Sequence, residues 1–362
     1  MVEAREGRGI DSVAMPPTAA RLGAALRLTL ILTLASTAAA APQAIEEDAS
    51  PDAWERVDDR PPLALRWAEV LPEGGWRLAY EYRIQSFDDL RDGRDEVSRS
   101  EILSTGAVEI PEEVLWMEHV FELGWGWTEF TTLFLRVPFL DKELDGYVAG
   151  GGGDLDQESS GLGDVLLGVS HYCCASEEGG RLMLHAGVSA PTGSIDEEDD
   201  GPGGDQRLPY PMQLGTGTWD LHGGAAWIQN EEEWTWGVAL RGRLDLGRND
   251  EDYAVSDAGV LDLWASLPFD RDVLLTLGLR TSFWGDMHGE DDELDPDVDP
   301  LDDEHRQGGL RTDLILGAGW ELGDARDANR LELELGIPID EWLDGPQMST
   351  EWLLGVGWRY SF

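Results

Sequence analysis

The feature that most constrains the fold is an alternation of apolar and polar side chains with a period of two residues. It begins at Gly74 and recurs along the chain in runs of about ten residues. A strand that crosses a membrane in a β-barrel needs about 9–11 residues, whereas strands of soluble sheets usually have about five or six. The last run, Trp352 to Phe362, has aromatic residues on its apolar face and ends in an aromatic residue. The alternation therefore predicts membrane strands with lipid on one side and a wet lumen on the other.

The links between these runs alternate strictly between short and long. Short links lie near Gly126, Ser176 to Gly179, Asn230 to Glu232, Asp270 to Asp272 and Gly323 to Ala328. Long links are Asp141 to Ser159, Gly193 to Gly217, Gly247 to Ala258, Gly285 to Gln307 and Asp340 to Met348. Because barrels of this kind have an even number of strands, we assign Asp88 to Glu113 to the first extracellular loop. We predict an all-β fold, a transmembrane antiparallel β-barrel of about 12 strands with short periplasmic turns and long acidic extracellular loops.

One long link also carries a resemblance to a known family. Ala190-Pro191-Thr192-Gly193 is followed by LPYPMQLGTGTWDLHGG and preceded by Ser160-Gly161-Leu162-Gly163-Asp164. These residues resemble an outer-membrane barrel family named for the meta-pathway of phenol degradation, and the resemblance is specific over Glu118 to Trp236. It implies an outer-membrane barrel of the channel or transporter type, without naming a cargo.

The N-terminal region has the order of a secretory signal peptide. Arg21 and Arg27 precede the apolar run Leu28 to Leu34, and small residues follow up to Ala41. We therefore divide the chain into a signal peptide (1–41), a periplasmic N-terminal segment (42–73) with a short helix near Leu63 to Val70, and the barrel (74–362). Residues 1 to about 14 precede an internal methionine, Met15, and we interpret them as a non-native extension.

The charge and the cysteines exclude several classes of function. The formal net charge is −47, which excludes nucleic acid as a partner because phosphate backbones require Lys and Arg. The two cysteines, Cys173 and Cys174, are adjacent, so they close no useful disulfide loop. The expected partners are outer-membrane lipid, a small solute and divalent cations at the acidic loops, and no cofactor is expected.

The loop from Asp286 to Glu304 is the most acidic. Its residues Asp295, Asp297 and Asp299 have the spacing that opens a calcium-binding loop, but Pro300 stands where a glycine is needed and Arg306 where a bidentate glutamate belongs. These three aspartates are weak cation candidates, and a solvated run of charge is the alternative.

No arrangement of residues predicts catalysis. Ser170 and His171 are neighbours on one strand, so their side chains point to opposite faces and cannot act as nucleophile and base. We predict that the protein is not an enzyme.

The charged residues on predicted inward faces are the candidate functional residues. They are Arg77, Glu81, Arg83, Arg136, Asp164, Arg181, His185, Asp220, Arg241, Arg243, Asp245, Asp262, Arg280, Arg311, Asp313, Glu332, Glu334 and Arg359. Such residues either pair with one another and fill the barrel, or line a polar path and set its selectivity. We predict a passive channel for small solutes in the outer membrane of a Gram-negative-type bacterium. The alternative is a closed structural or surface-binding barrel whose acidic loops bind cations or a partner.

Overall fold

The computed structural model describes residues 60–176, 179–201, 204–322 and 329–362. The predicted signal peptide and the first part of the predicted periplasmic segment, residues 42–59, lie outside this range. No helix among the described residues is both long and apolar enough to cross a membrane.

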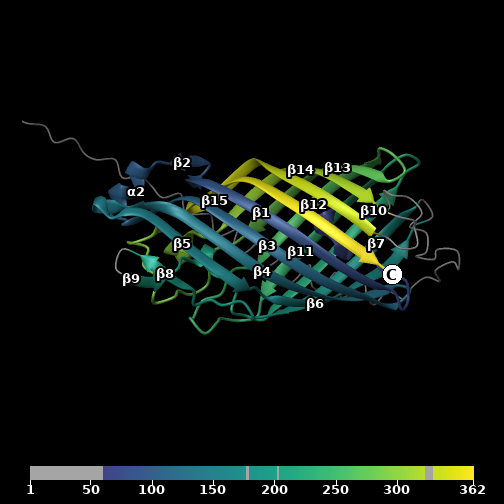
Figure 1. Ribbon diagram of the computed structural model, residues 1–362, viewed down its shortest axis with the longest axis horizontal. Coiled ribbons are helices and arrows are strands. Elements are labelled where there is room, and N and C mark those ends of the chain that lie inside the picture. The colour runs from purple at the N-terminus through teal and green to yellow at the C-terminus, as the bar shows by residue number, and fades with distance from the viewer. Residues whose placement is uncertain (1–59, 177–178, 202–203, 323–328) are drawn as a thin grey trace, which may run out of the picture. The chain divides into compact units, whose positions relative to one another are not determined.

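An antiparallel sheet forms a closed wall because its last strand pairs with its first (Figure 1). In chain order, the wall strands are β1 (Trp76–Gly93), β3 (Glu109–Thr128), β4 (Thr131–Val148), β6 (Val165–Ala175), β7 (Gly180–Ala190), β10 (Asp220–Asn230), β11 (Thr235–Asp245), β12 (Ala258–Pro268), β13 (Val273–Trp284), β14 (Gly309–Glu321) and β15 (Asn329–Ser361). Each wall strand pairs with its neighbours in the chain, which confirms the predicted barrel.

The last strand crosses the wall twice. Its first part, from Arg330 to Leu343, pairs with β14, and its second part, from Leu343 to Ser361, pairs with β1. Between them Gly345 has a φ of +142°, which a residue with a side chain rarely adopts. The eleven wall strands of the described chain therefore make twelve passes, as predicted. The backbones of Trp76 and Phe362 bond to each other, so the barrel begins and ends at the same rim.

The strands β1, β3 and β4 are 18, 20 and 18 residues long, well beyond the length needed to cross a membrane. Their outer ends extend into regions that the sequence analysis assigned to loops. The expected long loop from Asp141 to Ser159 is instead a β-ribbon, in which β4 turns through η3 (Ala149–Gly151) and pairs with β5 (Gly153–Leu162). The expected first loop contains β2 (Asp95–Val97) and α2 (Arg99–Thr105). These strands were assigned to loops because their sequences are acidic and rich in glycine.

The two faces of the wall differ as the alternation requires. On β1, Leu78 is 43% exposed whereas its neighbour Arg77 is 1% exposed. On the second pass of β15, Val356 and Trp358 face outward while Arg359 is fully buried. An outer surface that exposes this many large apolar side chains would aggregate in water, and it suits contact with lipid.

Residues 60–72, which we call the N-terminal plug, fold inside the wall. Their 3₁₀-helix η2 (Leu63–Ala68) coincides with the predicted short helix, and every side chain from Leu63 to Leu71 is buried. The plug contacts strands from all around the wall. Leu65, Trp67 and Val70 form a cluster with apolar side chains of β6, β7, β10, β11 and β12. This part of the expected periplasmic segment therefore fills the lumen at the rim where the barrel begins and ends.

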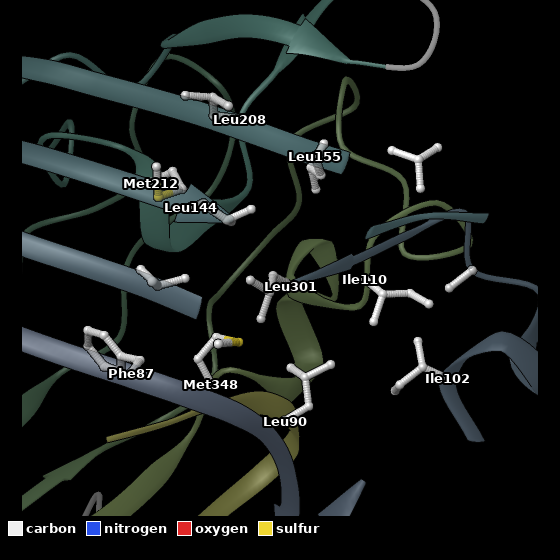
Figure 2. Close-up of a cluster of buried hydrophobic side chains, with 13 residues drawn as sticks. Phe87, Leu90, Ile102, Ile110, Leu144, Leu155, Leu208, Met212, Leu301 and Met348 are labelled. Carbon is white, nitrogen blue, oxygen red and sulfur yellow. The ribbon is translucent and has the colours of Figure 1, made fainter. Parts of the chain in front are cut away.

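The opposite rim is covered by inward-folded loops. We call residues 208–216 and 285–307 the lid; they contain η4 (Tyr210–Met212), η5 (Pro300–Asp302) and η6 (Glu304–Arg306). Beside the lid, β8 (Glu198–Gly201) and β9 (Gly204–Arg207) form a separate hairpin. Figure 2 shows Met212 and Leu301 of the lid in one cluster with Phe87, Leu144 and Met348 of the wall.

Candidate functional site

The candidate site is a cavity of about 540 Å³ in the lumen, next to the lid. Apolar and aromatic side chains make up one part of its lining: Phe87, Val114, Trp116, Leu214, Trp284, Met287, Leu301 and Met348. Charged side chains make up another part: Lys142, Asp164, Arg243, Arg311 and Glu341. Cavities that hold small molecules typically measure about 300–1,000 Å³ and combine an apolar lining with a few polar groups. The size and lining of this one are those of a small-molecule site.

The N-terminal plug is fixed to the wall by buried ion pairs. The carboxylate of Glu69 lies 3.3 Å from the Arg77 guanidinium and 2.5 Å from that of Arg359. Arg66 pairs with Glu81 on β1. Arg241 on β11 donates from Nη1 to the carbonyl oxygen of Ala64 at 2.9 Å. Because each of these groups is removed from water, every partner is needed to keep the others compensated.

Packing reinforces these ion pairs. The ring of Trp67 lies 5.2 Å from that of His185, centroid to centroid, and the His185 ring stacks on Phe134. The backbone N–H of Leu71 donates to the hydroxyl of Thr132 at 2.7 Å. No signal in the sequence pointed to this arrangement, because residues 60–72 show neither a sustained period nor a motif.

The lid is held by hydrogen bonds from wall side chains to its backbone. Nζ of Lys142 donates to the carbonyl oxygens of Pro211 and Gln213 at 2.7 and 2.6 Å. The hydroxyl of Ser159 donates to the carbonyl oxygen of Met212 at 2.6 Å. The lid segment is thereby fixed over the cavity, with the Met212 side chain in the apolar cluster.

The residues that carried the family resemblance meet at a break in the wall. Gly163 and Asp164 separate β5 from β6, which both pair with β4. Oδ1 of Asp164 accepts from the N–H groups of Thr192 and Gly193, and Oδ2 accepts from the N–H and the hydroxyl of Thr216. The two distant sequence blocks thus form one hydrogen-bonded knot at the edge of the cavity.

The predicted inward-facing residues fall into connected ion pairs. Near the plug, Glu332 pairs with Arg330 and Arg359, and Arg136 pairs with Glu122. At mid-height, Glu81 pairs with Arg83, Asp262 with Arg241 and Arg280, and Glu334 with Arg280. Near the cavity, Asp220 and Asp245 pair with Arg243, and Asp313 pairs with Arg311. Arg181 donates to Asn230. The role of these residues in selectivity stays a prediction.

Several residues of these networks were missed by the sequence analysis. Glu69 and Arg66 lie in the plug, outside any strand, and Glu122 belongs to a strand whose inward face was not assigned. Lys142 was placed in a loop. A signal for it did exist, because it is the only lysine in the chain.

The weak cation candidates take part in local hydrogen bonds of the lid. Oδ1 of Asp295 accepts from the N–H of Asp297, and Oδ1 of Asp299 accepts from the N–H of Leu301. Burial raises the pKa of Asp299 and of the adjacent Asp302. Within the described ranges, no three side chains of His, Cys, Asp or Glu gather in a group that could hold a metal ion. Cation binding here stays a prediction.

Comparison with known proteins places the chain in a family. Residues 99–316 match the family described as putative MetA-pathway of phenol degradation. The chain belongs to this family. No curated protein matches the sequence. Among solved structures, an outer membrane channel from Pseudomonas putida F1 is similar, with 17% identity, a TM-score of 0.55, and coverage of 82% of this chain and 98% of that one. The family member described here thus shares its β-barrel fold with that outer membrane channel.

Other barrels are more distant. The toluene transporter TodX from Pseudomonas putida has 10% identity, a TM-score of 0.36, and coverage of 88% of this chain and 94% of that one. The translocator domain of the autotransporter NalP from Neisseria meningitidis has 11% identity, a TM-score of 0.43, and coverage of 82% and 91%. At these scores neither likeness bears on function.

Proposed function

We propose that this protein is a passive outer-membrane channel for small solutes, shown here with its lumen closed by the N-terminal plug. The observation that carries the proposal is the cavity inside a closed wall, with a lid on one side and a plug in the other half of the lumen. A barrel that served only as a scaffold would have no need of a 540 Å³ internal space.

Displacement of the plug would open one end of the lumen, and movement of the lid would open the other. The plug belongs to the N-terminal end of the chain and forms no part of the wall sheet, so it can leave while the wall keeps its hydrogen bonds. Passage from the cavity then requires no break between wall strands.

The test is single-channel conductance of the refolded protein in a planar bilayer, compared with a variant that lacks residues 42–72. We expect rare, short openings for the full chain and a steady, larger conductance for the deletion variant. A deletion variant that inserts with native, heat-sensitive mobility on a gel but does not conduct would contradict the proposal.

The second candidate is a closed barrel that binds a partner or cations at its outer rim. The buried ion pairs of Glu69 favour it, because they fix the plug firmly. In that case the acidic lid, including Asp295, Asp297 and Asp299, would bind divalent cations. Two results together would support this candidate instead. Neither the full chain nor the deletion variant would conduct in the bilayer, and the protein would bind calcium until these aspartates are replaced by asparagine.

A further inference from the structure

The only lysine of the chain lies in the cavity without a counter-ion. Lys142 is 7% exposed, and its two recorded hydrogen bonds go to the uncharged carbonyl oxygens of Pro211 and Gln213. Among the described residues, no carboxylate forms an ion pair with it. A charge removed from water is normally paired, because desolvation otherwise costs several kcal/mol. The described neighbours therefore give the amine of Lys142 two uncharged acceptors and no ion-pair partner at the cavity wall.

Two arginines of the lining keep uncommitted N–H groups. Arg243 uses Nη2 to donate to the carbonyl oxygen of Ser256 at 2.9 Å, and its Nη1 bonds to none of the described residues. Arg311 uses Nε for Asp313 and Nη1 for the hydroxyl of Thr350, and its Nη2 bonds to none of them. Neither of these Nη atoms is among the buried polar atoms without a partner in the described chain, and both arginines line the cavity.

The two carboxylates of the lining, in contrast, are occupied. Asp164 accepts four hydrogen bonds in the knot at the wall break. Glu341 accepts from the hydroxyl of Ser349 and the N–H of Thr350. The charged part of the cavity thus offers donors and one unpaired ammonium, and no free carboxylate oxygen. This asymmetry matches a ligand with a negatively charged acceptor group.

The remaining lining suits an apolar body. The ring of Trp116 lies 4.7 Å from Nζ of Lys142, so the charged and aromatic parts of the lining are adjacent. Phe87, Met287 and Met348 line the same space. The acidic loops would repel an anion on approach, but charges farther away than about 10 Å are largely screened at 0.1 M salt. The groups in the cavity itself therefore decide which ligand binds.

We propose that the cavity binds a small monocarboxylate with an apolar body, and that Lys142 supplies the charge that holds its carboxylate, with Arg243 or Arg311 as additional donors. The inference rests on the proposed channel function, since it names the class of solute carried. Binding to the cavity is nevertheless measurable without transport.

Isothermal titration of the full chain in detergent tests this inference with three probes of the same shape. These are 3-phenylpropionate, the neutral 3-phenylpropionamide and the cationic 3-phenylpropylamine. We expect saturable binding of one 3-phenylpropionate per chain, at least tenfold weaker binding of the amide, and no binding of the amine. Equal affinity for the three probes, or no binding of the carboxylate, would overturn the inference.

Variants then assign the selectivity to Lys142. Lys142→Met keeps the apolar stem and should remove the preference for the carboxylate, whereas Lys142→Arg should restore it. Arg271→Gln, in an exposed turn between β12 and β13, is the matched control and should bind like the wild type. An unchanged preference in a folded Lys142→Met variant would overturn the assignment. Carboxylate binding without conductance would refute the channel and leave this inference standing; conductance without any carboxylate binding would do the reverse.

Discussion

The two halves of the lumen are built from the same kinds of residue and differ in whether every charged side chain forms an ion pair with an opposite charge. Around the N-terminal plug, Glu69 lies between two guanidinium groups and Arg66 pairs with Glu81. Around the cavity, Lys142 has hydrogen bonds to carbonyl oxygens and forms no ion pair with a described carboxylate. The difference teaches that matched charges hold the chain in place, whereas unmatched charges beside a cavity mark a place for a ligand.

Breaking the plug's central ion pair should give the largest effect. Glu69→Ala removes the carboxylate shared by Arg77 and Arg359, and loss of one partner from a buried pair costs about 3–5 kcal/mol. The undocked population should rise about 100-fold or more, since each 1.4 kcal/mol is about a factor of ten. Trypsin cleavage after Arg66, which is buried in the docked plug, measures this population.

Asp340→Asn is the matched control for the cleavage experiment. It breaks the exposed ion pair between Asp340 of β15 and Arg94, and exposed pairs contribute little. The cleavage rate should stay at the wild-type value. A rate that also stays there in Glu69→Ala would show that the ion pairs do not hold the plug.

Loosening the lid should leave the plug untouched. Leu301 is 1% exposed within the apolar cluster, so Leu301→Ala should cost about 2–5 kcal/mol of lid packing. Hydrogen exchange should accelerate in residues 291–307, while trypsin cleavage after Arg66 stays unchanged. Faster cleavage in this variant would mean that the two halves are coupled, contrary to the comparison drawn above.

Variants of two arginines on β11, Arg241 and Arg243, should affect different halves of the lumen, because Arg241 contacts the plug and Arg243 lines the cavity. Arg241→Ala removes the hydrogen bond to the plug carbonyl of Ala64 and should raise cleavage after Arg66 about tenfold, because a charged hydrogen bond contributes about 1.5–3 kcal/mol. Arg243→Ala should leave cleavage unchanged and shift the reversal potential in a salt gradient. Faster cleavage in Arg243→Ala, together with an unchanged cleavage rate in Arg241→Ala, would refute these assignments.

The smallest effect is a pH dependence of the lid. Burial and the neighbouring Asp299 raise the pKa of Asp302, with Glu109 and Asp295 adding to the same effect. The closed lid therefore holds a proton that the open lid releases, so closure weakens as pH rises from the open-state pKa toward the raised one. Hydrogen exchange in residues 291–307, corrected for its intrinsic rate, should be faster at pH 8.5 than at pH 5.5. Asp302→Asn should remove most of this difference, and an equal difference in the variant would exclude Asp302 as its source.

The wall could be predicted from the sequence because the pattern that specifies each wall strand lies within that strand. A period of two residues assigns Leu78 to lipid and Arg77 to the lumen without knowledge of any partner strand. The strict alternation of short and long links then predicts that the chain crosses the wall an even number of times. The length of the outer strands was missed, since Asp141 to Ser159 is acidic and interrupted by glycines, and cross-strand pairing with β5 decides its structure.

The plug and the cavity could not be predicted because the residues that form them come from distant parts of the sequence. The environment of Glu69 is created by Arg77 and Arg359, which lie in the first and the last wall strand. Lys142 becomes buried only when the lid folds back over it and accepts its hydrogen bonds. The family resemblance located the knot at Asp164 in sequence, but only the structure shows Thr192 and Thr216 bound to one carboxylate.

The account depends most directly on the plug lying inside the lumen, and cysteine accessibility measures this. In a background with Cys173→Ser and Cys174→Ser, Leu65→Cys is compared with Glu73→Cys, which lies just beyond the plug at an exposed position. We expect a membrane-impermeant maleimide to label position 73 within minutes and to leave position 65 unlabelled until the protein is unfolded. Equally fast labelling of both positions in the folded protein would contradict a lumen closed by this segment.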